Sequence, residues 1–265
     1  MGSPKAALDW HGSTLLRRVT GLAQRTVDGP VVVVRAPGQT LPEISPSIEV
    51  VSDAREGRGP LQGLAAGLAA LRDRAEVAFV SSTDVPLLHP AFIRRVLDAV
   101  DADVDVALPE IHGFRQPLSA AYRTSLLAEV QRLVTAEKLK PAFLFERCRV
   151  RRLDDAAMLR DAAVAALDPD LSSVRNLNER SDYEAAHAQP PPEIEVRRFG
   201  TLAMNGARRA ESVGAWSLGE LADATGLILD EHVVAALNGE QITRDRHLPL
   251  AAGDTVGFMV ADAGG

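Results

Sequence analysis

The sequence predicts an α/β protein, in which a larger N-terminal domain with a doubly wound parallel sheet is followed by a small α+β domain. Short apolar, β-branched runs alternate with helical segments in the first half of the chain, which is typical of βαβ units. Prolines at 190–192 then interrupt the pattern, and after them apolar and charged residues alternate, as in half-buried strands. With 265 residues the chain is long enough for two domains, since domains typically have about 100–200 residues.

The N-terminal elements follow from the spacing of their apolar residues. Ser13 and Thr14 precede apolar residues spaced as in an amphipathic helix, so we expect a helix to begin there. Residues 31–34 are four valines after Gly29-Pro30, which is typical of a buried parallel strand. The later elements that we expect are strands at 48–52, 77–81, 104–108, 119–123 and 150–153, helices at 61–74, 91–100 and 124–136, and a short closing helix around Tyr183.

Composition marks the linker and the second domain. Because proline cannot continue a helix, Gln189 and the three prolines predict a stiff spacer at 189–192 between domains at 1–188 and 193–265. Strands wrapped around one helix within about 70 residues then predict a β-grasp fold. The elements that we expect are strands at 194–199, 210–213, 233–237 and 255–260, a helix at 217–225 capped by Ser217, and a tight turn at Asn238-Gly239.

Charge and cysteine content exclude several classes of function. The net charge of −7 argues against a nucleic-acid partner, which would need a basic surface. The one cysteine, Cys148, can form neither an intrachain disulfide nor a cysteine cluster for a metal. No apolar run reaches the ~18 residues of a membrane span, and the first residues lack the apolar stretch of a signal peptide. We therefore expect a cytoplasmic protein without a membrane span.

An aspartate after a predicted strand is the first candidate for chemistry. Asp84 lies in Ser-Ser-Thr-Asp-Val-Pro, just past the strand at 77–81, and ligands bind at the carboxyl ends of strands in α/β sheets. A carboxylate there suits Mg²⁺, which takes one or two carboxylates together with substrate phosphates. The alternative is that Asp84 only caps a turn before Pro86, and the motif alone does not exclude it.

Two further segments are weak signals by themselves. Gly57 and Gly59 precede a predicted helix with Pro60 near its first turn, so backbone N–H groups can approach a ligand closely there. A plain strand-to-helix turn explains the same residues. Lys5, near the N-terminus, is equally well explained as a solvated lysine.

Taken together, these segments resemble the nucleotidyltransferases of molybdenum cofactor biosynthesis, which comprise the molybdopterin guanylyltransferases and cytidylyltransferases. Lys5 falls on the lysine of the family's opening signature, and Asp84 falls on its metal-binding aspartate. Asp53 falls on an acidic position that the family associates with the guanine site, and Gly59-Pro60-Leu61-Gln62-Gly63 matches its Gly-Pro-Leu-Ala-Gly segment. Residues 116–122 resemble a substrate-side strand of the family. Asn176-Leu177-Asn178, followed by Asp182, resembles its closing Asn-x-Asn segment and the acidic residue after it.

The resemblance implies an enzyme with a Rossmann-like nucleotidyltransferase domain of GT-A type over residues 1–188. Its implied reaction is Mg²⁺-dependent transfer of a nucleotidyl group from GTP, or from CTP, to molybdopterin with release of pyrophosphate. Lys5 and Asp84 are then the catalytic residues, Asp84 and Asn178 hold the metal, and the nucleotide is bound by Lys5, Asp53, Gly59, Pro60, Leu61 and Asp84. The sequence as given begins after the family's first strand and Gly-rich loop, so we expect weakened GTP binding. A sugar-phosphate nucleotidyltransferase is a further alternative.

The C-terminal domain resembles the small sulfur-carrier subunit of molybdopterin synthase. The segments that match are residues 194–202, 218–221, 237–240 and 250–260, and the final Gly264-Gly265. Without side chains, such a tail can thread into the active site of a partner. The resemblance implies that Gly265 is adenylated and becomes a thiocarboxylate, with the large synthase subunit and its adenylating enzyme as partners. The alternative function is therefore a sulfur carrier whose N-terminal domain is catalytically impaired.

Overall fold

The computed structural model describes residues 4–53, 59–203 and 210–261 of the chain. The chain divides into two compact units, unit 1 with residues 1–8 and 14–179 and unit 2 with residues 9–13 and 180–265. The division lies before the proline linker, so the helix expected around Tyr183 groups with unit 2. Among the described residues, no helix is long and apolar enough to cross a membrane.

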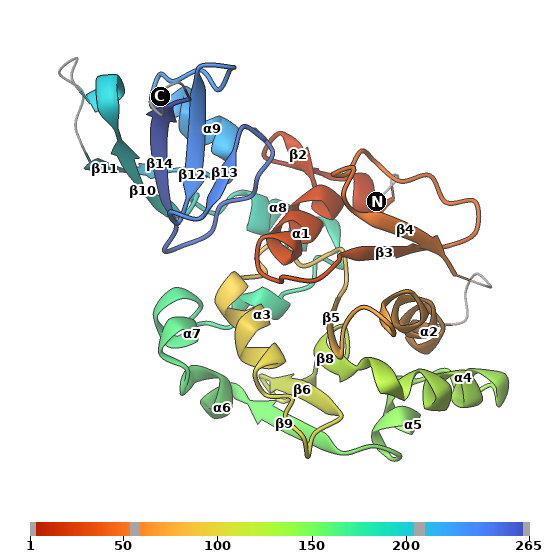
Figure 1. Cartoon of the computed structure of the whole chain (residues 1–265). Helices are drawn as coiled ribbons and strands as arrows, with labels where there is room; N and C mark the ends of the chain where they lie inside the picture. The colour runs from red at the N-terminus through yellow and green to blue at the C-terminus, as the bar shows by residue number, and fades with distance from the viewer. Residues whose placement is uncertain (1–3, 54–58, 204–209, 262–265) are drawn as a thin grey trace. The chain divides into compact units, whose positions relative to one another are not determined.

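Unit 1 is built on a five-stranded sheet that is mixed and not wholly parallel (Figure 1). Strand β8 (Ser119–Arg123) lies between β5 (Val77–Ser81) and β6 (Val106–Ile111) and runs antiparallel to both. Strand β9 (Val150–Asp154) pairs in parallel with β6. The expectation of a parallel sheet is therefore wrong at β8. Residues 112–118, which connect β6 to β8, are too few for the crossover of a dozen or more residues that parallel neighbours need.

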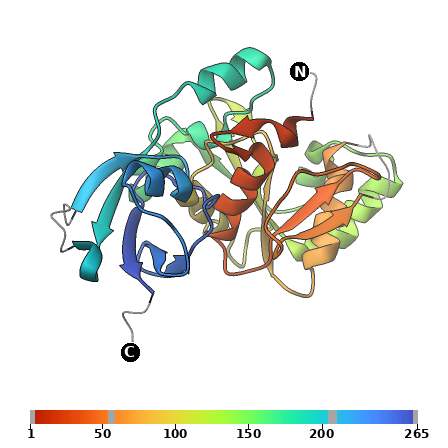
Figure 2. The same ribbon diagram turned by 90° about the horizontal axis from the view of Figure 1, so that it is seen from above.

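A two-stranded sheet in unit 1 is separate from the five-stranded one. Strands β3 (Val32–Arg35) and β4 (Glu49–Ser52) lie side by side (Figure 1 and Figure 2) and pair in parallel. Within the described part of the chain, β3 pairs with β4 alone and β5 with β8 alone. A cavity of about 300 Å³ is lined by residues of both β3 and β5 and by apolar side chains of two helices, α1 (Leu15–Gln24) and α2 (Pro60–Leu71).

Two helices of unit 1, α1 and α3, begin at residues whose side chains cap them. The Oγ1 atom of Thr14 accepts a hydrogen bond from Arg17 N (3.2 Å) and caps α1 where the sequence predicts its start. Helix α3 (Pro90–Leu97) is capped by His89, whose Nδ1 accepts from Ala91 N (3.0 Å). The remaining short elements of unit 1 are η1 (Lys5–Ala7), β7 (Phe114–Arg115), η2 (Thr124–Leu126), α4 (Leu127–Thr135), α5 (Pro141–Phe145), α6 (Asp155–Leu159), α7 (Ala162–Leu167) and η3 (Ser172–Val174).

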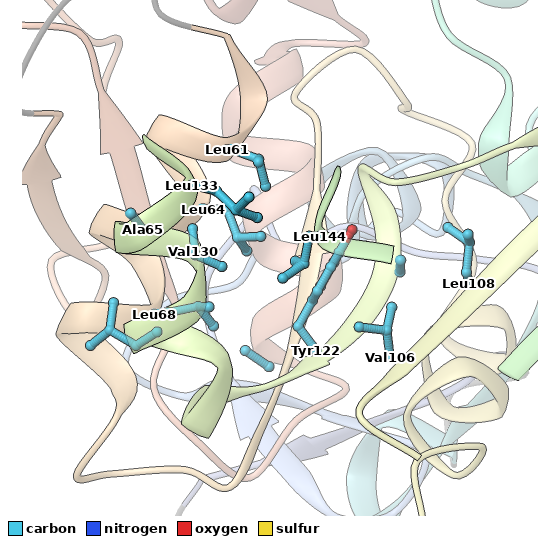
Figure 3. Close-up of a cluster of buried hydrophobic side chains, with 13 residues drawn as sticks. Leu61, Leu64, Ala65, Leu68, Val106, Leu108, Tyr122, Val130, Leu133 and Leu144 are labelled. Carbon is cyan, nitrogen blue, oxygen red and sulfur yellow. The ribbon is translucent and has the colours of Figure 1, made fainter. Parts of the chain in front are cut away.

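The main core of unit 1 fills the space between the sheet and helices α2 and α4 (Figure 3). Leu61 and Leu68 of α2 and Val130 of α4 are almost completely buried there. Tyr122 of β8 is 1% exposed, and its hydroxyl donates to Pro117 O (2.8 Å). Burial raises the pKa of this hydroxyl well above its ordinary value, so Tyr122 is a neutral structural residue.

Unit 2 contains a five-stranded sheet in the order β11-β10-β14-β12-β13. Its central strands β10 (Glu193–Arg198) and β14 (Thr255–Val260) are parallel, while the other pairs are antiparallel. The structure confirms the elements that the sequence predicts in this part of the chain, and it adds a short edge strand. Besides β10 and β14, the predicted elements are β11 (Ala210–Gly214), α9 (Leu218–Ala224) and β12 (Val233–Leu237). The elements that the sequence does not predict are the short helix η4 (Gly200–Ala203) and the edge strand β13 (Gln241–Thr243).

The core of unit 2 is separate from the core of unit 1. Ile194 and Val196 of β10, Leu221 of α9 and Phe258 of β14 are completely buried within it. The turn at Asn238-Gly239 has φ of 52° and 80°, which is the left-handed conformation that these two residue types tolerate in tight hairpins.

A short hairpin near the N-terminus belongs to unit 2 except for its last residue, Thr14, which belongs to unit 1. It comprises β1 (Asp9–Trp10) and β2 (Ser13–Thr14) and packs with α8 (Arg180–His187) in an aromatic cluster. The rings of Trp10 and Trp216 meet edge to face with centroids 5.5 Å apart, and His11 stacks on His187 at 4.1 Å. Because these aromatic residues are distant in sequence, no local pattern predicts their contact.

Candidate active site

Asp84 lies in the segment that leaves the carboxyl end of β5. The backbone of this segment is fixed on two sides, since Ser82 N donates to Leu118 O (3.1 Å) and Leu177 N donates to Asp84 O (2.9 Å). Leu177 is completely buried, so the second bond ties Asp84 to the protein interior. The Asp84 side chain is 16% exposed, which places a partly shielded carboxylate at the edge of the sheet.

Lys5 and Asn178 meet Asp84 although they are distant in sequence. Lys5 Nζ donates to Asp84 Oδ2 (2.9 Å) and to Asn178 Oδ1 (3.0 Å). Ala6, which follows Lys5 in η1, is 8% exposed and anchors this part of the chain. The Lys5 side chain is 37% exposed, so its ion pair adds little to stability. The arrangement instead holds a cation and two oxygen ligands together.

The geometry of this cluster fits a divalent cation with oxygen ligands. The ammonium of Lys5 is held by a carboxylate and an amide oxygen at once, so the two oxygens converge on one cation position. Mg²⁺ prefers such ligands and completes its coordination with waters and substrate phosphates. Across the described ranges, no group of three His, Cys, Asp or Glu residues is placed to hold a metal, so Asp84 and Asn178 are the candidate ligands that the chain itself supplies.

The predicted nucleotide loop leads into α2. Gly59 caps this helix with a φ of 78°, a conformation that strains residues with a Cβ. Pro60 occupies the first helical turn, where its missing N–H costs nothing. Asp53 N donates to Arg35 O (2.7 Å) at the end of β4. Residues 54–58, with Arg55, Gly57 and Arg58 among them, lie outside the described residues.

The side chain of Leu61 does not line a nucleotide site. It is completely buried in the core of unit 1, because α2 turns this position toward the sheet. Its backbone N–H lies in the first turn of a twelve-residue helix, where amides remain available to an anion. The prediction that Leu61 binds the nucleotide therefore applies to its backbone N–H and not to its side chain. Gly264 and Gly265, the predicted sulfur-carrier terminus, lie outside the described residues.

A second cavity of unit 1 is lined in part by residues to which we assigned no role from the sequence, namely Phe114, Arg115 and Arg175. It has a volume of about 590 Å³ and its lining includes Phe114, Arg115, Arg175 and Asn176. Asn176 Oδ1 accepts a hydrogen bond from Ser82 Oγ (3.4 Å). The sequence does hold a signal for this place, since His112-Gly113 predicts a turn that carries the aromatic Phe114 to its far side.

The cysteine is a poor candidate for a nucleophile. Cys148 is about half buried, and this burial, with smaller contributions from the negative charges of Asp105 and Glu129, raises its pKa to about 11. Because only a thiolate attacks efficiently, this thiol stays protonated and inert near neutral pH. Cys148 packs against the core of unit 1.

Comparison with known proteins identifies the family of this arrangement. The family model described as "MobA-like NTP transferase domain" matches residues 1–152. Among curated relatives, a molybdenum cofactor guanylyltransferase from Desulfosudis oleivorans is 28% identical over 187 residues, which cover 71% of this chain and 87% of that protein. A probable molybdenum cofactor guanylyltransferase from Mycobacterium avium is 35% identical over 189 residues, which cover 70% of this chain and 87% of the relative.

A solved structure shares the fold of the larger part of the chain. Molybdopterin-guanine dinucleotide biosynthesis protein A from Archaeoglobus fulgidus matches with a TM-score of 0.54 at 22% identity, over 70% of this chain and 90% of that one. This match supports the α/β nucleotidyltransferase fold, and the family model covers more than half of the chain. The chain therefore belongs to the MobA-like NTP transferases, the family of the molybdenum cofactor guanylyltransferases, and is a nucleotidyltransferase.

Proposed function

We propose that this chain transfers a nucleotidyl group, with GMP preferred, from an NTP to the terminal phosphate of molybdopterin and releases pyrophosphate. The observation that carries the proposal is the cluster of Lys5, Asp84 and Asn178 at the carboxyl end of β5. Relatives with 28% and 35% identity are named as molybdenum cofactor guanylyltransferases, which supports both the reaction and the substrates.

The residues of the cluster divide the work of binding phosphates. Lys5 turns its ammonium to the nucleotide phosphates and neutralises their charge, which frees the oxygens of Asp84 and Asn178 to hold Mg²⁺. A bound Mg²⁺ supplies Lewis-acid stabilisation of the charge that develops on phosphate oxygens. The backbone around Gly59 and the first turn of α2 face the nucleotide, and Asp53 accepts hydrogen bonds from the base. Such chemistry depends on positioning and electrostatics and needs no covalent nucleophile.

The proposed reaction is a single displacement at the α-phosphorus. A phosphate oxygen of molybdopterin forms the new bond to the α-phosphorus of the NTP. The bond between that phosphorus and the oxygen bridging to the β-phosphate breaks, and pyrophosphate leaves with its electron pair. Lys5 Nζ lies within 3.0 Å of both proposed metal ligands, so its positive charge is close to the phosphates of a nucleotide bound there.

Replacement of the central carboxylate tests this mechanism. We expect Asp84→Ala and Asp84→Asn to lower pyrophosphate release from GTP and molybdopterin by at least about 10²-fold, because the electrostatic contribution of such a group is of that size. A matched control is Asp73→Ala, since the Asp73 side chain is 82% exposed. Unchanged turnover in both Asp84 variants would refute the proposed metal role.

The choice of nucleotide needs its own experiment. The preference for GTP over CTP rests on the names of the relatives and on the position of Asp53 at the end of β4. Pyrophosphate release measured with GTP, CTP, UTP and ATP against molybdopterin decides the preference. We expect the highest kcat/KM with GTP and a selective loss of GTP use in Asp53→Ala, whereas a flat profile would contradict the guanine assignment.

A second function is favoured by the sheet of unit 2. We propose that residues 193–265 form a β-grasp domain that carries sulfur on Gly265. The order β11-β10-β14-β12-β13, with parallel central strands and α9 on the core, supports this assignment. Its partners would be an adenylating enzyme and the large subunit of molybdopterin synthase. If unit 1 is catalytically impaired, which is the alternative function, sulfur carriage on Gly265 is the remaining activity of the chain.

Intact-mass measurement tests the carrier function directly. The full chain is incubated with an adenylating enzyme, ATP and a sulfur donor. We expect a mass gain equal to the replacement of one oxygen by sulfur, and we expect no gain in a variant that lacks Gly265. The Asp84→Ala variant serves as a control that keeps the tail intact. No gain in the wild type would contradict the carrier assignment and leave the transferase proposal untouched.

A further inference from the structure

The second cavity of unit 1, called here the β7 cavity, has the size and lining of a ligand site. Its volume of about 590 Å³ lies within the range of about 300–1,000 Å³ that is usual for small-molecule pockets. Its lining includes Phe114 and Arg115 of β7, and Arg175 and Asn176, which follow η3. An aromatic face and two guanidinium groups therefore border one hollow.

Phe114 is held in an exposed position by a fixed hairpin. Its side chain is 72% exposed, although a large apolar side chain gains free energy from burial. The hairpin is rigid because His112 N donates to Asp155 Oδ1 (2.9 Å) and Phe114 pairs with Ile111 across the turn. An exposed aromatic ring on a pre-organised support is typical of a surface that stacks on a planar ligand.

The lining of this cavity contains two arginines, Arg115 and Arg175, and one acidic residue, Asp170, so positive charge is in excess and favours an anion. Arg175 is exposed at the cavity wall, and Arg115 has Glu110 as a loose partner at 3.9 Å. At that distance the pair does not meet hydrogen-bond geometry, so Arg115 keeps donors for a ligand. A guanidinium presents several N–H groups in a planar fork that matches a phosphate.

One short segment connects this cavity to the proposed catalytic cluster. Residues 175–178 carry Arg175 and Asn176 to the cavity and Asn178 to Lys5. Asn176 also bonds to Ser82 (3.4 Å), and Leu177 N bonds to the backbone of Asp84. A phosphate held by Arg175 is therefore next to the segment that contacts Ser82 and Asp84.

We propose that the β7 cavity is the acceptor subsite, in which Phe114 stacks on the fused heterocycle of the acceptor and Arg175, assisted by Arg115, binds its phosphate. The assignment rests on the proposed function, since it takes a pterin phosphate as the acceptor. It adds residues that determine acceptor affinity and not nucleotide affinity. Phe114 and Arg175 are binding residues here and take no part in bond making.

Titration of the full-length chain with three probes tests the proposal. The probes are a fluorescent pterin carrying a phosphomonoester side chain, the same pterin without phosphate, and inorganic phosphate. We expect Phe114→Ala to weaken binding of both pterins about tenfold, as is usual for lost stacking on an aromatic side chain, and to leave phosphate binding unchanged. We expect Arg175→Ala to weaken binding of the pterin phosphate and of inorganic phosphate but not of the unphosphorylated pterin. Phe114→Trp keeps an aromatic ring at this position and should bind both pterins like the wild type.

Matched controls and a nucleotide titration separate this proposal from the one on which it rests. Ile228→Ala removes an equally exposed apolar side chain in unit 2, and Arg160→Ala removes an exposed arginine elsewhere in unit 1. Both should bind the pterin phosphate like the wild type, and binding of a fluorescent GTP analogue should be the same in all variants. If Phe114→Ala and Arg175→Ala bind the pterin phosphate like the wild type, the subsite assignment is wrong. If the wild type binds the GTP analogue but not the pterin phosphate, the subsite assignment is also wrong. If the wild type binds neither ligand, both the subsite assignment and the proposed function are wrong.

Discussion

At the scale of single residues, Asp105 shows how a carboxylate in unit 1 is stabilised by its partner. Arg149 donates from Nη2 to Asp105 Oδ1 (2.7 Å) and from Nε to Oδ2 (3.0 Å). The hydrogen bond from the Arg149 side chain is the main cause that lowers the pKa of Asp105 below 3.8. Because the pKa of Asp105 is lower in the folded state than in the unfolded state, the pair stabilises the fold at pH values above 3.8. This contribution to stability is lost as the pH falls through the pKa of the folded state.

We therefore expect Asp105→Asn to destabilise unit 1 by about 1 kcal/mol near neutral pH, a modest value because the arginine is partly exposed. The difference from the wild type should shrink below pH 3.8, where the carboxylate of the unfolded wild type is protonated. Urea unfolding at about pH 7 and at about pH 3 measures this difference in the free energy of unfolding. Asp73→Asn is the control, since that side chain is 82% exposed and pairs with Arg72 and not with Arg149. An equal difference at both pH values would contradict the linkage.

At the scale of elements, the start of α9 is fixed by reciprocal hydrogen bonds. Glu220 N donates to Ser217 Oγ (3.3 Å), while Glu220 Oε2 accepts from Trp216 N (2.7 Å). This arrangement resembles a capping box, in which a serine and the glutamate three residues later satisfy backbone groups at the helix start. The cap also fixes the approach of Trp216, which belongs to the aromatic cluster of unit 2.

Removal of this cap should weaken unit 2 and leave unit 1 intact. We expect Ser217→Ala to lower the free energy of unfolding of unit 2 by about 1 kcal/mol, because a backbone N–H at the helix start loses its acceptor. Ser217→Asp keeps an acceptor and should retain most of the stability. Hydrogen exchange of α9 and β14 reports the change. Faster exchange in Ser217→Asp to the same extent as in Ser217→Ala would mean that the cap is not the cause.

At the scale of the whole molecule, unit 1 has a small cluster of buried residues at Ala6, Leu16, Val33 and Ile48, and the described residues also form two larger hydrophobic cores. One lies around Tyr122 in unit 1, and the other around Phe258 in unit 2. Each core contains residues of one unit only. Because a domain with its own core can fold independently, damage to one core should be confined to its unit.

A cavity in the second core tests this independence. We expect Phe258→Ala to destabilise unit 2 by about 3–5 kcal/mol, because the removed ring is completely buried. Protection of β5 and β8 from hydrogen exchange should stay at the wild-type level. Leu64→Ala in unit 1 is the reciprocal variant, and it should leave β10 and β14 protected. Loss of protection in both units from either change would show that they unfold together.

The sequence predicts local elements well and distant contacts less well. The strand at 77–81 and the helix that begins after Thr14 follow from periodicity and a capping residue, which act within a few positions. Lys5, Asp84 and Asn178 are brought together only by the family resemblance, and the structure places them within hydrogen-bond distance. Each residue alone is ambiguous, because a lysine or an aspartate near a turn is usually just solvated.

The parts that the sequence does not predict depend on tertiary geometry. The direction of β8 is decided by a connection too short for a parallel crossover. The side chain of Leu61 is buried because of how α2 lies on the sheet, which a motif match does not specify. The contact of Trp10 with Trp216 joins segments about two hundred residues apart, and no periodic pattern extends over such a distance.

The inward-facing edge of β3 has a consequence for the solution behaviour of the protein. An edge rich in valine is the kind of strand that recruits other chains into intermolecular sheets. None of the four residues of β3 is exposed, and across the cavity its neighbour is β5 of the same unit. Because residues of α1 and α2 line the same cavity as β3, we expect two molecules to join through this edge only when one of these helices moves. Aggregation should therefore be limited by a rare local opening of unit 1, and its rate should respond to ligands or substitutions that keep these helices in place.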